Sequence, residues 1–257
     1  MKCEYEVDQK GVVILKVNNP PLNAIDEELM DQMEAALQNI AGDDAAKVVV
    51  ITGEGMAFIA GADIKKMQEI NTAAETESMS QRGQGLLTMI ENSRKPVIAA
   101  INGLALGGGT ELALACHIRI AAQSAQMGLP EVRLGILPGF GGTQRSARLL
   151  GPARALELML TGKFIGMAEA DKIGLVNMVV PDEELMDEAK KLASRIATKG
   201  QLAVRSIVEA VIEGVKMPLA EGLKMERELL GKLAESDDKR EGVAAFIEKR
   251  KAVFTDR

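Results

Sequence analysis

The chain has 257 residues, of which 47% are apolar and 26% are charged, and its net charge at pH 7 is −6. This composition is typical of a soluble globular protein, and the acidic balance argues against nucleic acid as a partner. Cys3 and Cys116 are the only cysteines, so we expect neither a disulfide framework nor a zinc or other metal site. No signal segment or membrane-spanning apolar run is recognisable, which favours a cytoplasmic protein without a membrane partner.

The N-terminal part alternates between β-rich and helical segments. Residues 11–17 and 47–52 are rich in β-branched side chains and predict buried strands. Between them, Asp26 is a predicted helix N-cap, and the helix is expected to end at Gly42. Residues 58–67 are expected to form a loop that turns into a helix. The apolar residues at helical spacing after Asp26 are Leu29, Met33, Leu37 and Ile40.

The middle of the chain repeats a strand, turn and helix pattern. The polar stretch 69–82 predicts a solvated helix or a mobile connection in preference to a flap over a site. A helix is expected at 85–92, followed by a strand at 97–101. A glycine-rich turn then leads into a helix at 109–116 and a strand at 118–122.

The C-terminal part changes from mixed segments to helices alone near residue 200. Before that point we expect helices at 153–161 and 167–173, a strand-like run at 174–180, and a long helix capped by Pro181 and Asp182. Alternation of strands and helices over the earlier part predicts an α/β layer architecture. The helices expected beyond Gly200 span 201–213, 218–235 and 238–251.

The stretch from Pro96 to Arg145 carries two glutamates, Glu111 and Glu131, each associated with a glycine-rich turn. Three glycines at 107–109 open a helix and leave backbone N–H groups exposed, which is a suitable site for an anionic oxygen. Two carboxyl groups near such a site suggest acid/base chemistry on a carbonyl compound. From the residues alone, Glu111 can equally be a first-turn acid that complements the helix dipole, and Glu131 a solvated loop charge.

Three other polar or reactive residues in this stretch have structural interpretations. His117, the only histidine, lies between a helix and a strand, which favours a structural histidine over a catalytic base. Cys116 lies in an apolar run and predicts a small buried side chain. Arg145 is interpreted as a structural hydrogen-bond donor that does not bind substrate.

Five motifs in this order resemble the crotonase (enoyl-CoA hydratase/isomerase) superfamily along nearly the whole chain. The resemblance implies an α/β fold, a crotonase-like spiral of ββα units with a C-terminal all-helical region. It implies a spiral core with the acyl-CoA site over 1–199 and a helical oligomerisation region over 200–257. The motifs are NA at 23–24, AGADI at 60–64, NGLALGGGTEL at 102–112, GLPEVRLGILPGFGGTQR at 128–145 and LTGKFIGMAEADKIGLVNMVV at 160–180.

The resemblance also implies the site. The backbone N–H groups of Ala62 and Gly108 correspond to an oxyanion hole for the thioester oxygen. Glu111 and Glu131 correspond to the two catalytic carboxyls that hold one water, with Glu111 usually the base and Glu131 the proton donor. No separate cofactor is expected, because CoA is part of the substrate. The residues that the resemblance places along the substrate or its CoA moiety are Ala24, Ala60, Asp63, Ile64 and Lys65.

By this resemblance the chain is expected to be an enoyl-CoA hydratase, which adds water reversibly to 2-trans-enoyl-CoA to give 3-hydroxyacyl-CoA, in fatty-acid or related acyl-CoA breakdown. Alternatives are another crotonase-family enzyme, such as a branched-chain enoyl-CoA hydratase or an enoyl-CoA isomerase, and a non-catalytic acyl-CoA-binding oligomer. The expected partners are an acyl-CoA thioester and further copies of the chain, in a hexamer built as a dimer of trimers.

Overall fold

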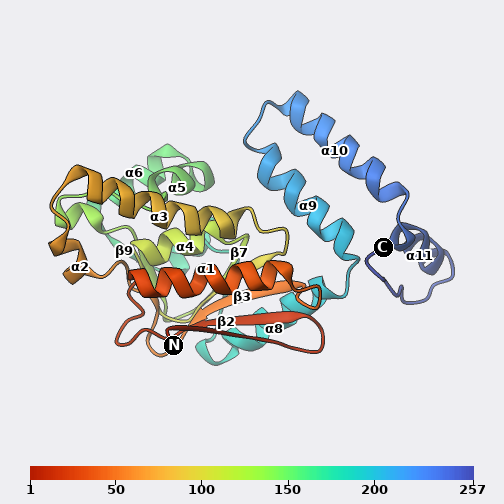
Figure 1. Cartoon of the computed structure of the whole chain (residues 1–257), viewed down its shortest axis with the longest axis horizontal. Helices are drawn as coiled ribbons and strands as arrows, with labels where there is room; N and C mark the ends of the chain where they lie inside the picture. The colour runs from red at the N-terminus through yellow and green to blue at the C-terminus, as the bar shows by residue number, and fades with distance from the viewer.

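The computed structural model describes residues 1–257, with the side chain of Lys65 excepted. Within this part, two sheets form the core, and the last three helices extend away from it (Figure 1). The larger sheet contains, in spatial order, β1 (Cys3–Val7), β2 (Val12–Val17), β3 (Val48–Gly53), β5 (Val97–Ile101), β7 (Ile118–Ala122) and β10 (Met178–Val180). The smaller sheet contains β4 (Ala57–Ile59), β6 (Leu104–Leu106), β8 (Gln126–Gly128) and β9 (Phe164–Gly166).

The helices connect and cover these sheets. They are α1 (Glu27–Gly42), α2 (Ile64–Glu69), α3 (Ala73–Glu91), α4 (Gly108–Ala115), α5 (Gly142–Leu150), α6 (Pro152–Thr161), α7 (Met167–Lys172), α8 (Leu185–Ala197), α9 (Gln201–Gly214), α10 (Leu219–Ala234) and α11 (Asp237–Ile247). Short 3₁₀ turns precede α5 and α8, at η1 (Glu131–Leu134) and η2 (Asp182–Glu184).

Consecutive strand pairs divide between the two sheets. The first strand of each pair, β3, β5 or β7, joins the larger sheet, and the second, β4, β6 or β8, joins the smaller one. Pairing is parallel except between β1 and β2 and between β8 and β9. A helix follows each pair, so the chain advances as the expected spiral of ββα units.

The larger sheet is buried because its central strands are nearly continuous apolar runs. Every residue of β3 and β5 is buried, as is typical of parallel strands covered on both faces. Helix α8 packs along β2, β3, β5 and β7, while α1 and α3 lie together on the other side (Figure 1). The Asp26 side chain accepts the N–H of Leu29, 2.8 Å away, which confirms the predicted N-cap of α1.

Helix α3 joins the polar stretch to the helix expected after it. It begins at Ala73, so residues 73–82 form a solvated helix, one of the two predicted forms, continuous with the helix expected at 85–92. A capping box starts it: the Thr72 hydroxyl accepts the N–H of Glu75, and the Glu75 carboxylate accepts the N–H of Thr72. The first turns of α3 are exposed, which is why they lack an apolar stripe.

The strands that were not expected are β1, which carries mostly polar side chains, and four short strands. β4, β6, β8 and β9 have three residues each, too few to show a period of two. The strand-like run at 174–180 forms a strand only at Met178–Val180. Helix α5, which follows the glycine-rich PGFG segment, was likewise not anticipated.

Beyond Gly200 the chain is helical, as expected. Helices α9 and α10 pack on one another and leave the core, and α11 follows at the far end (Figure 1). The C-terminal tail folds back, and the N–H groups of Thr255 and Asp256 donate to the Asp238 carboxylate. The division of the chain into 1–199 and 200–257 as separate domains stays a prediction.

In the described part of the chain, no helix combines the length and the apolar character needed to cross a membrane.

Candidate active site

The triple-glycine turn connects β6 to α4. Gly107 adopts a positive φ of 51°, which favours glycine, and its N–H donates to the Gly128 carbonyl at 2.9 Å. A Cβ atom at Gly109 would overlap the Ile59 carbonyl oxygen, so only glycine lets α4 approach β4 this closely. Gly108 is the first residue of α4, where a backbone N–H has no intrahelical acceptor.

Residues 22–25 and 60–63 run side by side beside this turn. Ile25 donates to the Gly61 carbonyl at 2.8 Å, and Asp63 donates to the Ile25 carbonyl at 3.0 Å. Ala62 lies between these two bonds in a parallel bridge with Ile25, so its own N–H points away from that neighbour. Within the described residues, neither the Ala62 nor the Gly108 N–H donates a hydrogen bond.

The two segments meet at their glycines. A Cβ atom at Gly107 would lie 3.8 Å from the Gly61 Cα atom, and one at Gly61 would lie 3.5 Å from the Leu106 carbonyl oxygen. Ala62 follows Gly61 and Gly108 follows Gly107, so their N–H groups belong to neighbouring backbone segments. The fold thus brings together the two segments that the resemblance names for an oxyanion hole.

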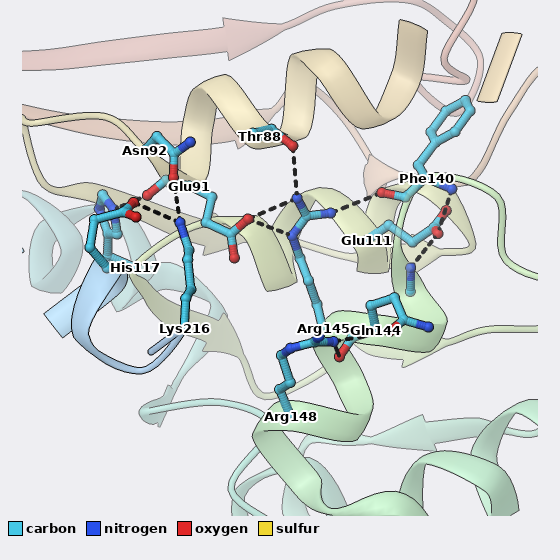
Figure 2. Close-up of polar contacts among 12 residues, drawn as sticks. Thr88, Glu91, Asn92, Glu111, His117, Phe140, Gln144, Arg145, Arg148 and Lys216 are labelled. Carbon is cyan, nitrogen blue, oxygen red and sulfur yellow. Dashed lines mark hydrogen bonds and ion pairs between the residues drawn. The ribbon is translucent and has the colours of Figure 1, made fainter. Parts of the chain in front are cut away.

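Glu111 lies in the first turn of α4 and is 2% exposed. Its Oε1 accepts hydrogen bonds from the N–H of Phe140 at 2.8 Å and of Gly142 at 2.7 Å (Figure 2). Burial raises the pKa of Glu111 to about 7; the charge of Glu131 acts in the same direction, whereas the two N–H donors and Arg145 oppose it. The carboxyl group therefore exchanges a proton near neutral pH.

Glu131 begins the 3₁₀ turn η1, and its carboxyl group lies beside the triple glycine. Its Oε1 would lie 2.8 Å from a Cβ atom at Gly107, so glycine leaves room for this carboxyl group. Its Oε2 is buried and has no hydrogen-bond partner among the described residues. Burial raises the pKa of Glu131, against a smaller opposite effect of its own backbone N–H. A buried oxygen without a partner is costly, and it suits a site where a water or substrate group binds.

Three of the residues expected along CoA lie on the same two segments, and the other two follow in α2. Ala60 donates to the Leu22 carbonyl, and Ala24 and Asp63 lie in the paired stretches next to it. Ile64 begins α2 and is 64% exposed. Lys65 follows it in α2, and its side chain lies outside the described residues.

Comparison with known proteins shows the family of the chain. The family model described as Enoyl-CoA hydratase/isomerase matches residues 7–257. The chain belongs to the enoyl-CoA hydratase/isomerase family. This membership confirms the expected crotonase-like α/β fold and the expectation of an enzyme.

Relatives in this family cover nearly the whole chain. A crotonyl-CoA hydratase of Syntrophomonas wolfei is 45% identical over 248 residues, covering 96% of this chain and 95% of that protein. A short-chain-enoyl-CoA hydratase of Clostridium acetobutylicum is 42% identical and covers 93% and 92%, respectively. The crystal structure of an enoyl-CoA hydratase from Bacillus anthracis superposes with a TM-score of 0.96 at 39% identity and covers 100% of both chains.

His117 and Cys116 have structural roles in the part of the chain that the structure describes. The His117 Nδ1 accepts the N–H of Val97 at 2.8 Å and Nε2 lies 3.0 Å from the Glu91 carbonyl oxygen, as expected of a structural histidine. Cys116 is buried, and burial raises its pKa to about 12. Among the described side chains, no group of three His, Cys, Asp or Glu residues is arranged to hold a metal ion.

Sequence reasoning missed the backbone groups that hold Glu111. The N–H groups of Phe140 and Gly142 lie in the GFGG part of a motif that was recognised only as a family signature. Asn23, a motif residue, has a structural role that the sequence pattern does not reveal. It is buried at a positive φ of 57°, and its side chain donates to the carbonyls of Glu54 and Ala57, which fixes the loop before Ala24.

Proposed function

We propose that this chain is an enoyl-CoA hydratase, which adds water reversibly across the C2–C3 double bond of 2-trans-enoyl-CoA to give 3-hydroxyacyl-CoA. The observation that carries the proposal is a pair of carboxyls beside the triple-glycine turn: Glu111 is buried, and Glu131 is half-buried with its Oε2 enclosed. Relatives named crotonyl-CoA hydratase and short-chain-enoyl-CoA hydratase, each matched over nearly full length, support it.

The thioester carbonyl oxygen is proposed to lie between the N–H groups of Ala62 and Gly108. Attack on C3 moves negative charge onto this oxygen as a thioester enolate forms. Each preorganised N–H donor can then contribute about 3 to 4 kcal/mol of transition-state stabilisation. Two donors from separate segments also orient the carbonyl, so that C2 and C3 face the carboxyl groups.

Glu111 is proposed as the base and Glu131 as the proton donor in hydration. Two N–H donors to the Glu111 Oε1 favour its carboxylate form, whereas the Glu131 Oε2 is buried without a donor, which favours the neutral form of that group. Water held by both groups gives a proton to Glu111 as its oxygen bonds to C3, and Glu131 gives its proton to C2. The two carboxyls exchange roles in dehydration, and their titrations are coupled.

CoA is proposed to extend along the paired segments, with Ala24, Ala60, Asp63, Ile64 and Lys65 as the contacting residues. No separate cofactor is needed, because both carboxyl groups and both N–H donors belong to the chain. The reaction fits fatty-acid or related acyl-CoA breakdown.

We further propose a homo-oligomer, a hexamer built as a dimer of trimers. Large apolar side chains remain exposed along the C-terminal helices, and such surfaces are usually covered by a partner. The exposed residues are Ile207, Val211, Val215, Leu219, Leu223, Leu230, Phe246 and Ile247.

The test follows the loss of absorbance of the conjugated enoyl thioester with crotonyl-CoA. Glu111→Gln and Glu131→Gln should each lower kcat at least ~10²-fold and leave acyl-CoA binding nearly unchanged, because each removes one proton-transfer group. Glu183→Gln, at an exposed glutamate in η2, is the control and should keep the full rate.

Three results would contradict the proposal. Full rates in both glutamine variants would show that these carboxyls do not perform the chemistry. Tight acyl-CoA binding without turnover by the wild-type protein would instead favour a non-catalytic oligomer. A product with a shifted double bond, identified by mass and retention time, would favour an isomerase.

A further inference from the structure

A series of polar contacts connects the C-terminal end of α3 to the Glu111 carboxyl, with Arg145 of α5 at its centre (Figure 2). The Arg145 Nη1 donates to the Phe140 carbonyl at 2.9 Å. On the other side, its Nη2 and Nε donate to the Glu91 Oε2 at 2.9 and 3.2 Å. None of these groups had a role in the chemistry described above.

Phe140 links this arginine to the carboxyl group. It lies in the PGFG loop (residues 138–141), its carbonyl accepts from Arg145, and its N–H donates to the Glu111 Oε1. The second donor, Gly142, follows directly at the start of α5. Gly141 has a φ of 107°, and a Cβ atom there would overlap the Arg145 guanidinium group. The loop therefore lies directly against the arginine, and only glycine permits this approach.

The other end of the series is anchored to the sheet. The Glu91 carbonyl faces the His117 Nε2 at 3.0 Å, and the His117 Nδ1 accepts the Val97 N–H at the start of β5. Because Nδ1 is an acceptor, Nε2 carries the proton and donates to Glu91. The Glu91 backbone is thus fixed at the end of α3, and its carboxylate pairs with Arg145 from this position.

The ion pair is partly shielded from solvent, since 13% of the Arg145 and 29% of the Glu91 side chain are exposed. Two charged groups influence Glu111, with opposite effects on its ionisation. Glu131 raises its pKa and Arg145 lowers it, while burial raises it most. Arg145 therefore acts on Glu111 both through the Phe140 peptide groups and through its charge.

We propose that Arg145 is a positioning residue for Glu111: held by Glu91, it fixes the PGFG loop so that the Phe140 and Gly142 N–H groups hold the carboxyl in its reactive orientation. The inference rests on the proposed function, because it takes Glu111 as the base of hydration. Arg145 itself does not touch the reacting atoms.

The test compares Arg145→Gln with Arg148→Gln on the wild-type background. Arg148 lies on the same helix, is exposed, and bonds only Gln144 within the described residues, so it is a matched control (Figure 2). R145Q should lower kcat for crotonyl-CoA about tenfold or more with KM changed less than about threefold, because the base is misplaced while binding groups remain. R148Q should behave as wild type.

The pH profile gives a readout that a purely structural role would not change. Loss of Arg145 removes a positive charge and loosens two N–H donors, and both changes disfavour the Glu111 carboxylate. The acidic limb of the kcat/KM profile should therefore move to higher pH in R145Q and stay in place in R148Q. Arg145→Lys, which keeps the charge but lacks the planar fork, should restore the limb partly.

Glu91→Gln is a second route to the same answer. The PGFG loop keeps hydrogen bonds from Ser80 and Gln84 to the Gly139 carbonyl, so R145Q is expected to fold. If R145Q does not unfold cooperatively, E91Q tests the positioning role in its place, because E91Q keeps the arginine but removes its charged partner. E91Q should lower kcat in the same direction as R145Q, in smaller measure, because the loop that holds Glu111 is less firmly held.

Glu111→Gln, measured in parallel, separates the two proposals. If E111Q is inactive but R145Q keeps the wild-type kcat and acidic limb, the positioning role is overturned and the hydratase proposal stands. Where R145Q does not fold, a wild-type kcat in E91Q leads to the same conclusion. A fully active E111Q overturns both. An inactive E111Q with a slowed, shifted R145Q supports both.

Discussion

At the residue scale, Glu111 is subject to two opposing effects of its environment. Burial disfavours its charged form, while the Phe140 and Gly142 N–H groups favour that form, and the pKa settles at about 7. A carboxyl group with this pKa is available as a base at neutral pH and as an acid in the reverse reaction. The same burial makes its ionisation unfavourable for folding.

We therefore expect stability to depend on pH through Glu111. Its folded-state pKa of about 7 lies above the usual 4.5, so between these values the folded state binds more protons and stability falls as pH rises. Glu111→Gln removes this effect. From pH 5 to pH 8, the free energy of unfolding of the variant should therefore rise relative to that of wild type by up to about 3 kcal/mol. Urea unfolding of both proteins at the two pH values, at one protein concentration, measures this difference. If the stability of both proteins changed equally with pH, Glu111 would not be the cause.

At the scale of elements, α3 supports the loop that holds Glu111. Gly83 faces the Phe140 ring, and a Cβ atom there would overlap the ring. Gly85, two residues further along the same helix, has nothing within 4 Å of the corresponding position. The two glycines thus differ in what surrounds them, although both lie within one helix.

This pair gives a matched prediction. Gly83→Ala should lower the free energy of unfolding by about 1 to 3 kcal/mol, because the added carbon displaces the buried Phe140 ring. It should also slow hydration, since Phe140 carries one donor to Glu111. Gly85→Ala should stabilise by about 0.5 to 1 kcal/mol through helix propensity and leave activity unchanged. Equal effects of the two substitutions on thermal unfolding would contradict this explanation.

At the scale of the whole molecule, the C-terminal helices extend from the core with little of their apolar surface covered. Their contact with the core includes a hydrogen bond from Lys216 to Asn92 and an ion pair between Asp256 and Lys47. These polar contacts secure the arrangement, but they do not bury the exposed apolar side chains. Assembly with further copies is the simplest way to cover them.

Charges placed on this surface should weaken assembly. A Val211→Lys/Val215→Lys variant, at residues that are 56% and 79% exposed, should shift sedimentation equilibrium toward smaller species, because charges resist burial in an interface. Gln38→Lys, at an exposed position of α1, controls for added charge and should sediment as wild type. An unchanged mass of the double variant would exclude these helices from the interface.

Part of the fold was predictable because its elements are long and regularly patterned. Helix α1 has a capping aspartate and an apolar stripe, and β3 and β5 are continuous apolar runs. The three-residue strands were not predictable, because their pairing depends on neighbours far along the chain. β6, for example, forms between β4 and β8, and no local period marks it.

The sequence by itself determined the glycine-rich turns, the two glutamates beside them and the change to helices near residue 200. Only the tertiary structure decided how these glutamates are held. The donors to Glu111 are backbone N–H groups 29 and 31 residues away, and the Arg145 to Glu91 ion pair spans 54 residues. Backbone donors leave no trace in side-chain identity, and burial, which sets the pKa of both carboxyls, exists only once distant segments pack together.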